Sequence, residues 1–106
     1  MENDFSNIIH PSGFNPPSAQ RKFLGDLYYL QLKSLEETDF HITANSYGFY
    51  VNQSTQGNFN PHPNPKFSSC ISLLDLLFQI SPKFKTKFQD VLKGVKVSEF
   101  QRLSQG

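Results

Sequence analysis

The sequence is poor in cysteine, in charge and in long apolar runs. Its 106 residues include one cysteine, Cys70, which excludes an intramolecular disulfide framework and any zinc site built from several cysteines. Ten Lys and Arg against nine Asp and Glu leave a net charge of +1, so the chain as a whole is not the strongly basic protein that grips duplex nucleic acid by charge. The longest apolar stretch, residues 71–80, is about half the length of a membrane-spanning helix. We therefore expect no membrane insertion.

Targeting signals are also missing from the sequence as given. It starts with Met-Glu-Asn-Asp, which places acids where a secretory signal carries basic charge, and it lacks the arginines of a mitochondrial presequence. The expected location is cytoplasmic. What the sequence does have is phenylalanine, at 11 positions, and 37% hydrophobic residues, which is too aromatic for a chain disordered throughout. A chain of this length forms one domain with one small core.

Composition divides the chain into three parts. Residues 1–20 are rich in Asn, Ser, Gly and Pro and have no apolar periodicity, so we expect a flexible, disordered N-terminal arm. Residues 21–95 are predicted to form a single α+β domain. Residues 96–106 form a tail in which Val97, Phe100 and Leu103 keep a helical spacing among Ser, Gln and Gly; a short frayed helix and disorder both remain open.

Three segments alternate with the period of two that is typical of strands. Residues 26–35 place Tyr28, Leu30 and Leu32 on the core side and Tyr29, Gln31 and Lys33 on the other. Residues 40–44 and 47–52 follow after short polar turns. The pattern predicts a three-stranded antiparallel meander.

Two helical patterns follow a long loop, residues 53–67, in which three prolines prevent a strand ladder. The first pattern runs to Ile80, and Ser81-Pro82 ends it and starts a second one. We expect these two consecutive helices to pack on the meander and to complete the core, made of Leu30, Leu32, Ile42, Phe49, Val51, Leu73, Leu77, Phe84 and Phe88.

No catalytic or metal-binding motif is present. His10, His41 and His62 have no cysteine or carboxylate at a zinc-ligand spacing, and neither a nucleophile elbow nor a phosphate-binding glycine loop occurs. Cys70 lies on the apolar stripe of the first helix and fits a small buried hydrophobe better than a reactive thiol. We therefore expect no enzyme activity, no cofactor, no metal and no small-molecule substrate.

Two groups of side chains are candidates for contact with RNA or with a protein partner. The first is on the second helix, which has one acid, Asp90, and several lysines. The lysines are Lys83, Lys85, Lys87 and Lys93, with Lys96 beyond them. An ordinary solvated helix surface is the alternative. The second group combines Arg21 and Lys22 with outward tyrosines, similar in type to surfaces that hold single-stranded RNA. These tyrosines are Tyr29, Tyr47 and Tyr50. Ordinary aromatic pairing across strands is the alternative for this group.

Four ordered blocks resemble a known family. Residues 13–36, with GDLYYL, residues 40–55, with GFYVNQST, residues 59–67, and residues 72–88, with QISP, are similar in order and spacing to the clustered-mitochondria proteins. The similar region lies between the family's N-terminal ubiquitin-like domain and its central conserved domain. The chain is therefore expected to be a fragment or a short relative of that family.

The resemblance implies a cytosolic, non-enzymatic protein. The family binds messenger RNAs for mitochondrial proteins, associates with ribosomes or translation initiation factors, and keeps mitochondria dispersed. Because its RNA contacts are not a short motif, no binding residue is carried over. Two hypotheses stay open: an RNA-associated module, or a protein-interaction module that docks on other domains of a full-length family member.

Overall fold

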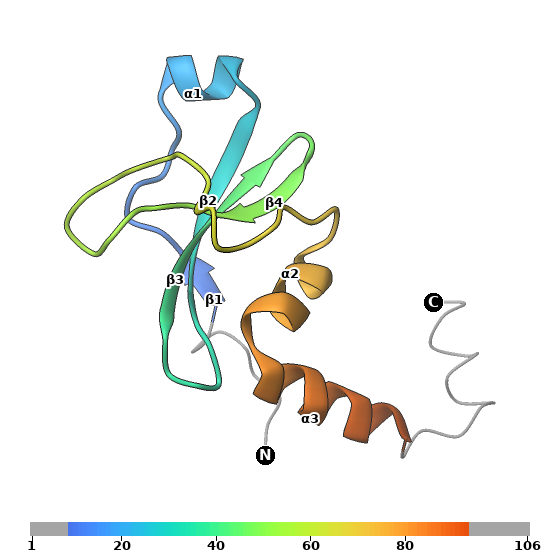
Figure 1. Cartoon of the computed structure of the whole chain (residues 1–106). Coiled ribbons are helices and arrows are strands. Elements are labelled where there is room, and N and C mark those ends of the chain that lie inside the picture. The colour runs from blue at the N-terminus through green and yellow to red at the C-terminus, as the bar shows by residue number, and fades with distance from the viewer. Residues whose placement is uncertain (1–8, 94–106) are drawn as a thin grey trace.

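The structure, a computed structural model, describes residues 9–93, and within them a four-stranded antiparallel sheet is combined with three helices (Figure 1). The strands lie in the order of the sequence: β1 (Ile9–Pro11), β2 (Asp26–Lys33), β3 (Asp39–Asn45) and β4 (Gly48–Val51). The helices are α1 (Ala19–Phe23), α2 (Leu73–Ile80) and α3 (Pro82–Lys93). The predicted α+β class is confirmed.

The predicted number of strands is wrong, because the segment expected to be a disordered arm supplies β1. Ile9 pairs with Leu32, and Pro11 pairs with Leu30. The first turn of α1 is capped by Ser18, whose hydroxyl accepts a hydrogen bond from the Arg21 amide. The expected disorder is therefore wrong for residues 9–20. Three residues that include a proline carry no recognisable strand pattern, so β1 depends on the free edge of β2 rather than on its own sequence. Residues 1–8 and the predicted tail 96–106 lie outside the described residues.

One face of the sheet carries the apolar core and is covered by α2. Leu32, Ile42 and Val51 are buried there, as predicted, while Leu30 and Phe49 are half-buried around them. From α2 the fully buried residues are Leu76 and Ile80, whereas Leu73 and Leu77, the predicted core positions, are only half-buried. Adjacent residues on a helix differ by about 100° in direction, and α2 is rotated so that Leu76, rather than Leu77, faces the sheet most directly.

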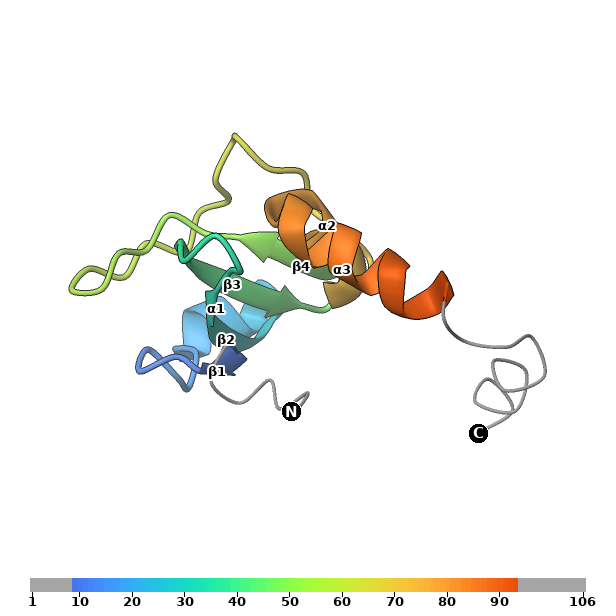
Figure 2. The same cartoon turned by 90° about the horizontal axis from the view of Figure 1, so that it is seen from below.

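The expectation that two helices pack on the sheet is wrong for α3. Among the described elements its backbone lies against α2 alone, none of its residues is fully buried, and Figure 2 shows it extending beyond the sheet. Phe84 and Phe88 instead join Phe78 of α2 in an aromatic cluster with ring centroids 5.4–5.9 Å apart.

Glu36 holds the junction between α2 and α3. Its carboxylate accepts hydrogen bonds from the hydroxyl of Ser81, at 2.7 Å, and from the backbone amide of Lys83, at 2.9 Å. The backbone amide of Lys83 and the hydroxyl of Ser81 therefore lower the pKa of Glu36 below its usual value. Because Glu36 belongs to the turn between β2 and β3, this contact fixes the start of α3 at one end of the sheet.

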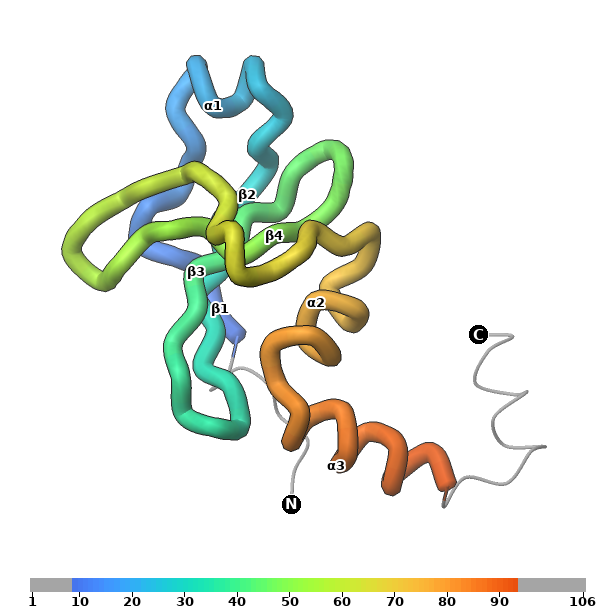
Figure 3. The backbone as a smooth tube through the Cα atoms, in the orientation of Figure 1, coloured from blue at the N-terminus to red at the C-terminus, as the bar shows by residue number. Residues whose placement is uncertain are grey.

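The opposite face of the sheet is also covered, so Tyr29 lies on the predicted face but is buried instead of exposed. Tyr29 is 2% exposed and stands edge-on to Phe59, with ring centroids 5.0 Å apart. Phe14, from the segment before α1, lies 5.1 Å from Phe59. A register irregularity between Asp26 and Tyr28 turns Asp26 toward the side of Tyr29. Tyr28 keeps the regular pairing of Leu30 and Leu32, but it is 40% exposed instead of inward. Figure 3 shows the long loop crossing the sheet.

Candidate functional site

The four lysines of α3 point away from the body of the protein without forming one surface. All four are exposed, and within residues 9–93 no acid lies close enough to any of them for an ion pair. Lys83 and Lys87 are one turn apart and share a shallow hollow of about 360 Å³ with Asp90. Lys85 is about 200° away from Lys83 around the helix, and Lys93 lies on a third side. Only Lys83 and Lys87 are therefore brought together.

Arg21 and Lys22 lie on α1, at the other end of the molecule from α3 (Figure 1). Lys22 is exposed. Arg21 is not free, because its Nε donates a hydrogen bond to Oδ2 of Asp26 at 2.9 Å. The predicted contact residues thus occupy two separate regions of the surface.

Asp26 is the centre of a buried polar cluster that the sequence did not reveal. It is 2% exposed, and it accepts hydrogen bonds from the Tyr29 hydroxyl, at 2.7 Å, and from the Asn45 amide, at 2.9 Å, as well as from Arg21. Burial raises the pKa of Asp26, but the three hydrogen bonds outweigh it and leave this pKa below its ordinary value. Burial and the bond to Asp26 raise the pKa of Tyr29 to about 12. The cluster is a structural clamp between α1 and the sheet.

The three predicted outward tyrosines do not form a stacking platform. Tyr29 is buried, and Tyr50 is half-buried with its hydroxyl donating to the carbonyl of Pro61 at 2.8 Å. Tyr47 alone is open, 88% exposed at the turn between β3 and β4. Base stacking by several aromatic rings is thus unsupported on this face.

A groove lies beside the first half of β3, next to the segment predicted from the sequence to be only a loop. It has a volume of about 450 Å³, and its lining includes Asp39 and His41 of β3 together with Gln53, Ser54 and Lys66 of the long loop. His41 is 8% exposed, and its Nδ1 is buried without a hydrogen-bond partner among the described residues. Burial lowers the pKa of His41, and the charge of Asp39 opposes this effect only in part.

The loop wall of this groove is built from many short hydrogen bonds. The Asn52 amide donates to the hydroxyl of Thr43, and its side-chain oxygen accepts from the Ser54 amide. The Ser54 hydroxyl in turn accepts from the backbone amide of Asn60 at 2.8 Å. Residues of the GFYVNQST segment therefore fasten the loop to the sheet, and no local pattern in the sequence distinguishes this from ordinary turn chemistry.

Within the described stretch, no helix combines the length and apolar character needed to cross a membrane. No group of three or more His, Cys, Asp or Glu in residues 9–93 is placed to hold a metal ion. The placement of Cys70 on the first helix is wrong, because Cys70 lies before α2; it is half-buried, and its backbone pairs with Phe49 of β4. At Gly48, which has a φ of +143°, any Cβ would collide with the carbonyl oxygen of Cys70, so this close approach requires glycine.

The fold and the site together define a small α+β domain that carries a basic helix beyond its sheet. The chain is 48% identical over 99 residues, 92% of its length, to the Clustered mitochondria protein homolog of Xenopus tropicalis. Over 86 residues, 81% of its length, it is 48% identical to Protein clueless of Drosophila willistoni and 45% identical to the Clustered mitochondria protein homolog of Culex quinquefasciatus. Over the stretch that it shares with these relatives, the chain belongs to the clustered mitochondria protein family.

The family resemblance expected from the sequence is thus confirmed. The chain spans only 6–8% of the length of these relatives, so it corresponds to a fragment of a family protein. No family model matches the sequence, and no solved structure matches it.

Proposed function

We propose that this chain is a non-enzymatic, cytoplasmic binding module of a clustered mitochondria protein, serving mitochondrial distribution and biogenesis by contacting messenger RNAs for mitochondrial proteins and the translation machinery. The observation that carries the proposal is the helix α3, which extends from the sheet with four exposed lysines, none of them paired with an acid within the described chain. Lysines that neutralise RNA phosphates release the cations condensed around the RNA, and this release is the main source of affinity in sequence-independent RNA binding.

The proposed RNA contact is centred on Lys83 and Lys87, which share one side of α3. With few phosphate contacts and no aromatic platform, we expect weak binding of little sequence preference. The lysine ammonium groups would contact the phosphates of the RNA backbone, and few contacts would be made with the bases.

Salt dependence tests this contact in a gel-shift titration with a single-stranded RNA of mixed sequence. Replacing Lys83 and Lys87 with Gln should flatten the log–log slope of affinity against salt by about 1.4, since each phosphate neutralised contributes roughly 0.7. The matched pair Lys85→Gln and Lys93→Gln removes the same charge from other sides of the helix and should flatten the slope less. Equal effects from the two pairs, or none from the first, would remove the Lys83–Lys87 side as the contact.

A second function is favoured by a different observation, the apolar surface left open by α2 and α3. Leu74 is 39% exposed and Val91 61% exposed, although both belong to amphipathic helices. In a relative more than ten times longer, another domain can cover such a surface. On this alternative the chain docks on other domains without touching RNA, Val91→Asn weakens the docking, and both lysine pairs leave RNA affinity unchanged.

A further inference from the structure

Strand β3 has an open edge over its first residues. β4 pairs only with Ile42–Asn45, and the last contact in that direction is the amide of Asn52, which donates to the carbonyl of His41 at 2.8 Å. Beyond Asn52 the chain turns away into the long loop. On its other side β3 stays paired along its whole length, with Phe40 opposite Leu32 and Asp39 opposite Lys33. The groove takes the place that a longer β4 would fill.

The backbone of Asp39 faces this groove. In an antiparallel ladder the N–H and C=O groups of one residue point to the same side, and residues two apart share that side. Since the carbonyl of His41 points toward Asn52, the backbone groups of Asp39 point the same way, into the groove. An edge of this kind is the template on which an extended chain adds as a further strand.

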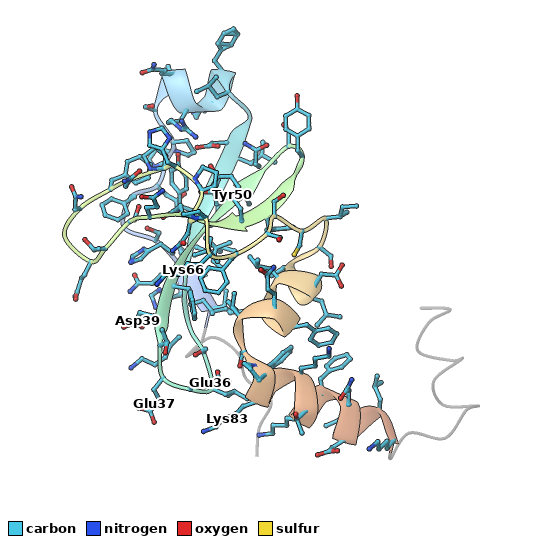
Figure 4. The ribbon with its side chains drawn as sticks, in the orientation of Figure 1. Glu36, Glu37, Asp39, Tyr50, Lys66 and Lys83 are labelled. Atoms are coloured by element: carbon cyan, nitrogen blue, oxygen red, sulfur yellow. The ribbon has the colours of Figure 1, made fainter. Side chains whose placement is uncertain are left out.

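The walls of the groove are charged, polar and already in place. Asp39 and Lys66, labelled in Figure 4, come from β3 and from the loop before α2, and neither side chain has an ion-pair partner within residues 9–93. Hydrogen bonds of Asn52 and Ser54 fix the loop wall, so little ordering is needed on binding. His41 of β3 also lines the groove, and its Nδ1 is buried without a hydrogen-bond partner within residues 9–93.

We propose that this groove binds an extended peptide segment, which adds as a strand beside the open start of β3 at Asp39 and carries a basic residue toward Asp39 and an acidic residue toward Lys66. The outer side of β4 is not available for the same purpose at Phe49, because the backbone of Cys70 already pairs there. The open stretch is short, so the affinity is modest and specificity comes mainly from the two charges.

The probe is a phage-displayed library of linear heptapeptides selected on the immobilised chain. Enriched peptides should lack central proline, should carry one basic and one acidic residue at a fixed separation, and should slow hydrogen exchange at the amide of Asp39. Binding of the synthesised peptides is then followed by fluorescence anisotropy.

Three variants distinguish the contribution of the backbone amide to peptide affinity from that of the side-chain charges. Asp39→Pro removes the amide that faces the groove and spares the pairing with β2, so affinity should fall about tenfold, the equivalent of one or two hydrogen bonds. Asp39→Asn keeps the amide and should abolish only the preference for a basic residue. Lys33→Gln, a charge change of the same size and opposite sign on the neighbouring strand, should leave binding within about twofold.

Peptides methylated at alternate backbone nitrogens give a readout that does not depend on the folding of any variant, and they should lose binding when the methylated amides are those that face β3. The proposal is overturned if no extended peptide is enriched, if enriched peptides bind Asp39→Pro as tightly as the parent, or if methylation at neither set of amides weakens binding.

Discussion

Replacing Leu76 with Ala is expected to lower the free energy of unfolding by about 2–5 kcal/mol. Leu76 is fully buried between α2 and the sheet, in contact with the cluster formed by Leu32, Ile42 and Val51. Loss of its side chain removes apolar contacts and leaves a cavity that the surrounding strands cannot close. A domain of this size is stabilised by only about 5–10 kcal/mol, so the midpoint of urea unfolding should fall sharply.

Two neighbouring leucines provide the controls for this prediction. Leu77→Ala should cost less than Leu76→Ala, because Leu77 is only half-buried. Leu74→Ala removes the same atoms from a side chain that is 39% exposed and should cost about 1 kcal/mol or less. If Leu77→Ala proved the most damaging of the three, the rotation of α2 described here would be incorrect.

Removing the carboxylate of Asp26 is the second large expected effect. Asp26→Ala leaves Arg21, the Tyr29 hydroxyl and the Asn45 amide without their shared acceptor, which should cost about 3 kcal/mol at pH 7. The exposed Asp39→Ala is the matched control and should change stability by about 0.5 kcal/mol or less.

The same cluster predicts a pH dependence of stability. The pKa of Asp26 is lower in the folded chain than its ordinary value of 3.8, so its contribution is fully present above that value and is lost as the pH falls through the folded pKa. Urea unfolding from pH 7 to pH 2 should therefore show a steeper loss below about pH 4 in the parent than in Asp26→Asn. Parallel curves for the two proteins would contradict the role given to this carboxylate.

The sequence predicted the α+β class, the three longer strands and the start of α3 because these depend on local periodicity and on capping residues. The start of α2 was expected too early, since Cys70 was placed on this helix, whereas Ser72 caps it and Leu73 is its first residue. Ser81-Pro82, by contrast, ends one helix and begins the next as expected. What it did not predict depends on partners distant in the chain. β1 is a strand only because β2 offers a free edge, and Tyr29 is buried only because Phe59 and Phe14 arrive from two loops.

The candidate site also combines features that follow from the local sequence with features that depend on distant parts of the chain. Exposure of the four α3 lysines could be predicted from their charge, whereas the pairing of Arg21 with Asp26 could not, because the register irregularity in β2 sets which side Asp26 faces. The groove beside β3 was invisible for a similar reason. It exists because β4 stops opposite Ile42, short of the first residues of β3, and because the long loop folds back to form a wall.

The most direct test of the central proposal uses the full-length Xenopus tropicalis homolog with its matching stretch exchanged for this chain, expressed in cells that lack their own family protein. Mitochondrial distribution is then scored by microscopy for the chimera, for its Lys83→Gln/Lys87→Gln variant, and for the matched Lys85→Gln/Lys93→Gln variant. We expect the chimera and the matched variant to restore dispersed mitochondria and the Lys83/Lys87 variant to leave them clustered. Full restoration by the Lys83/Lys87 variant, expressed at the same level, would contradict the proposal that this side of α3 is the working contact.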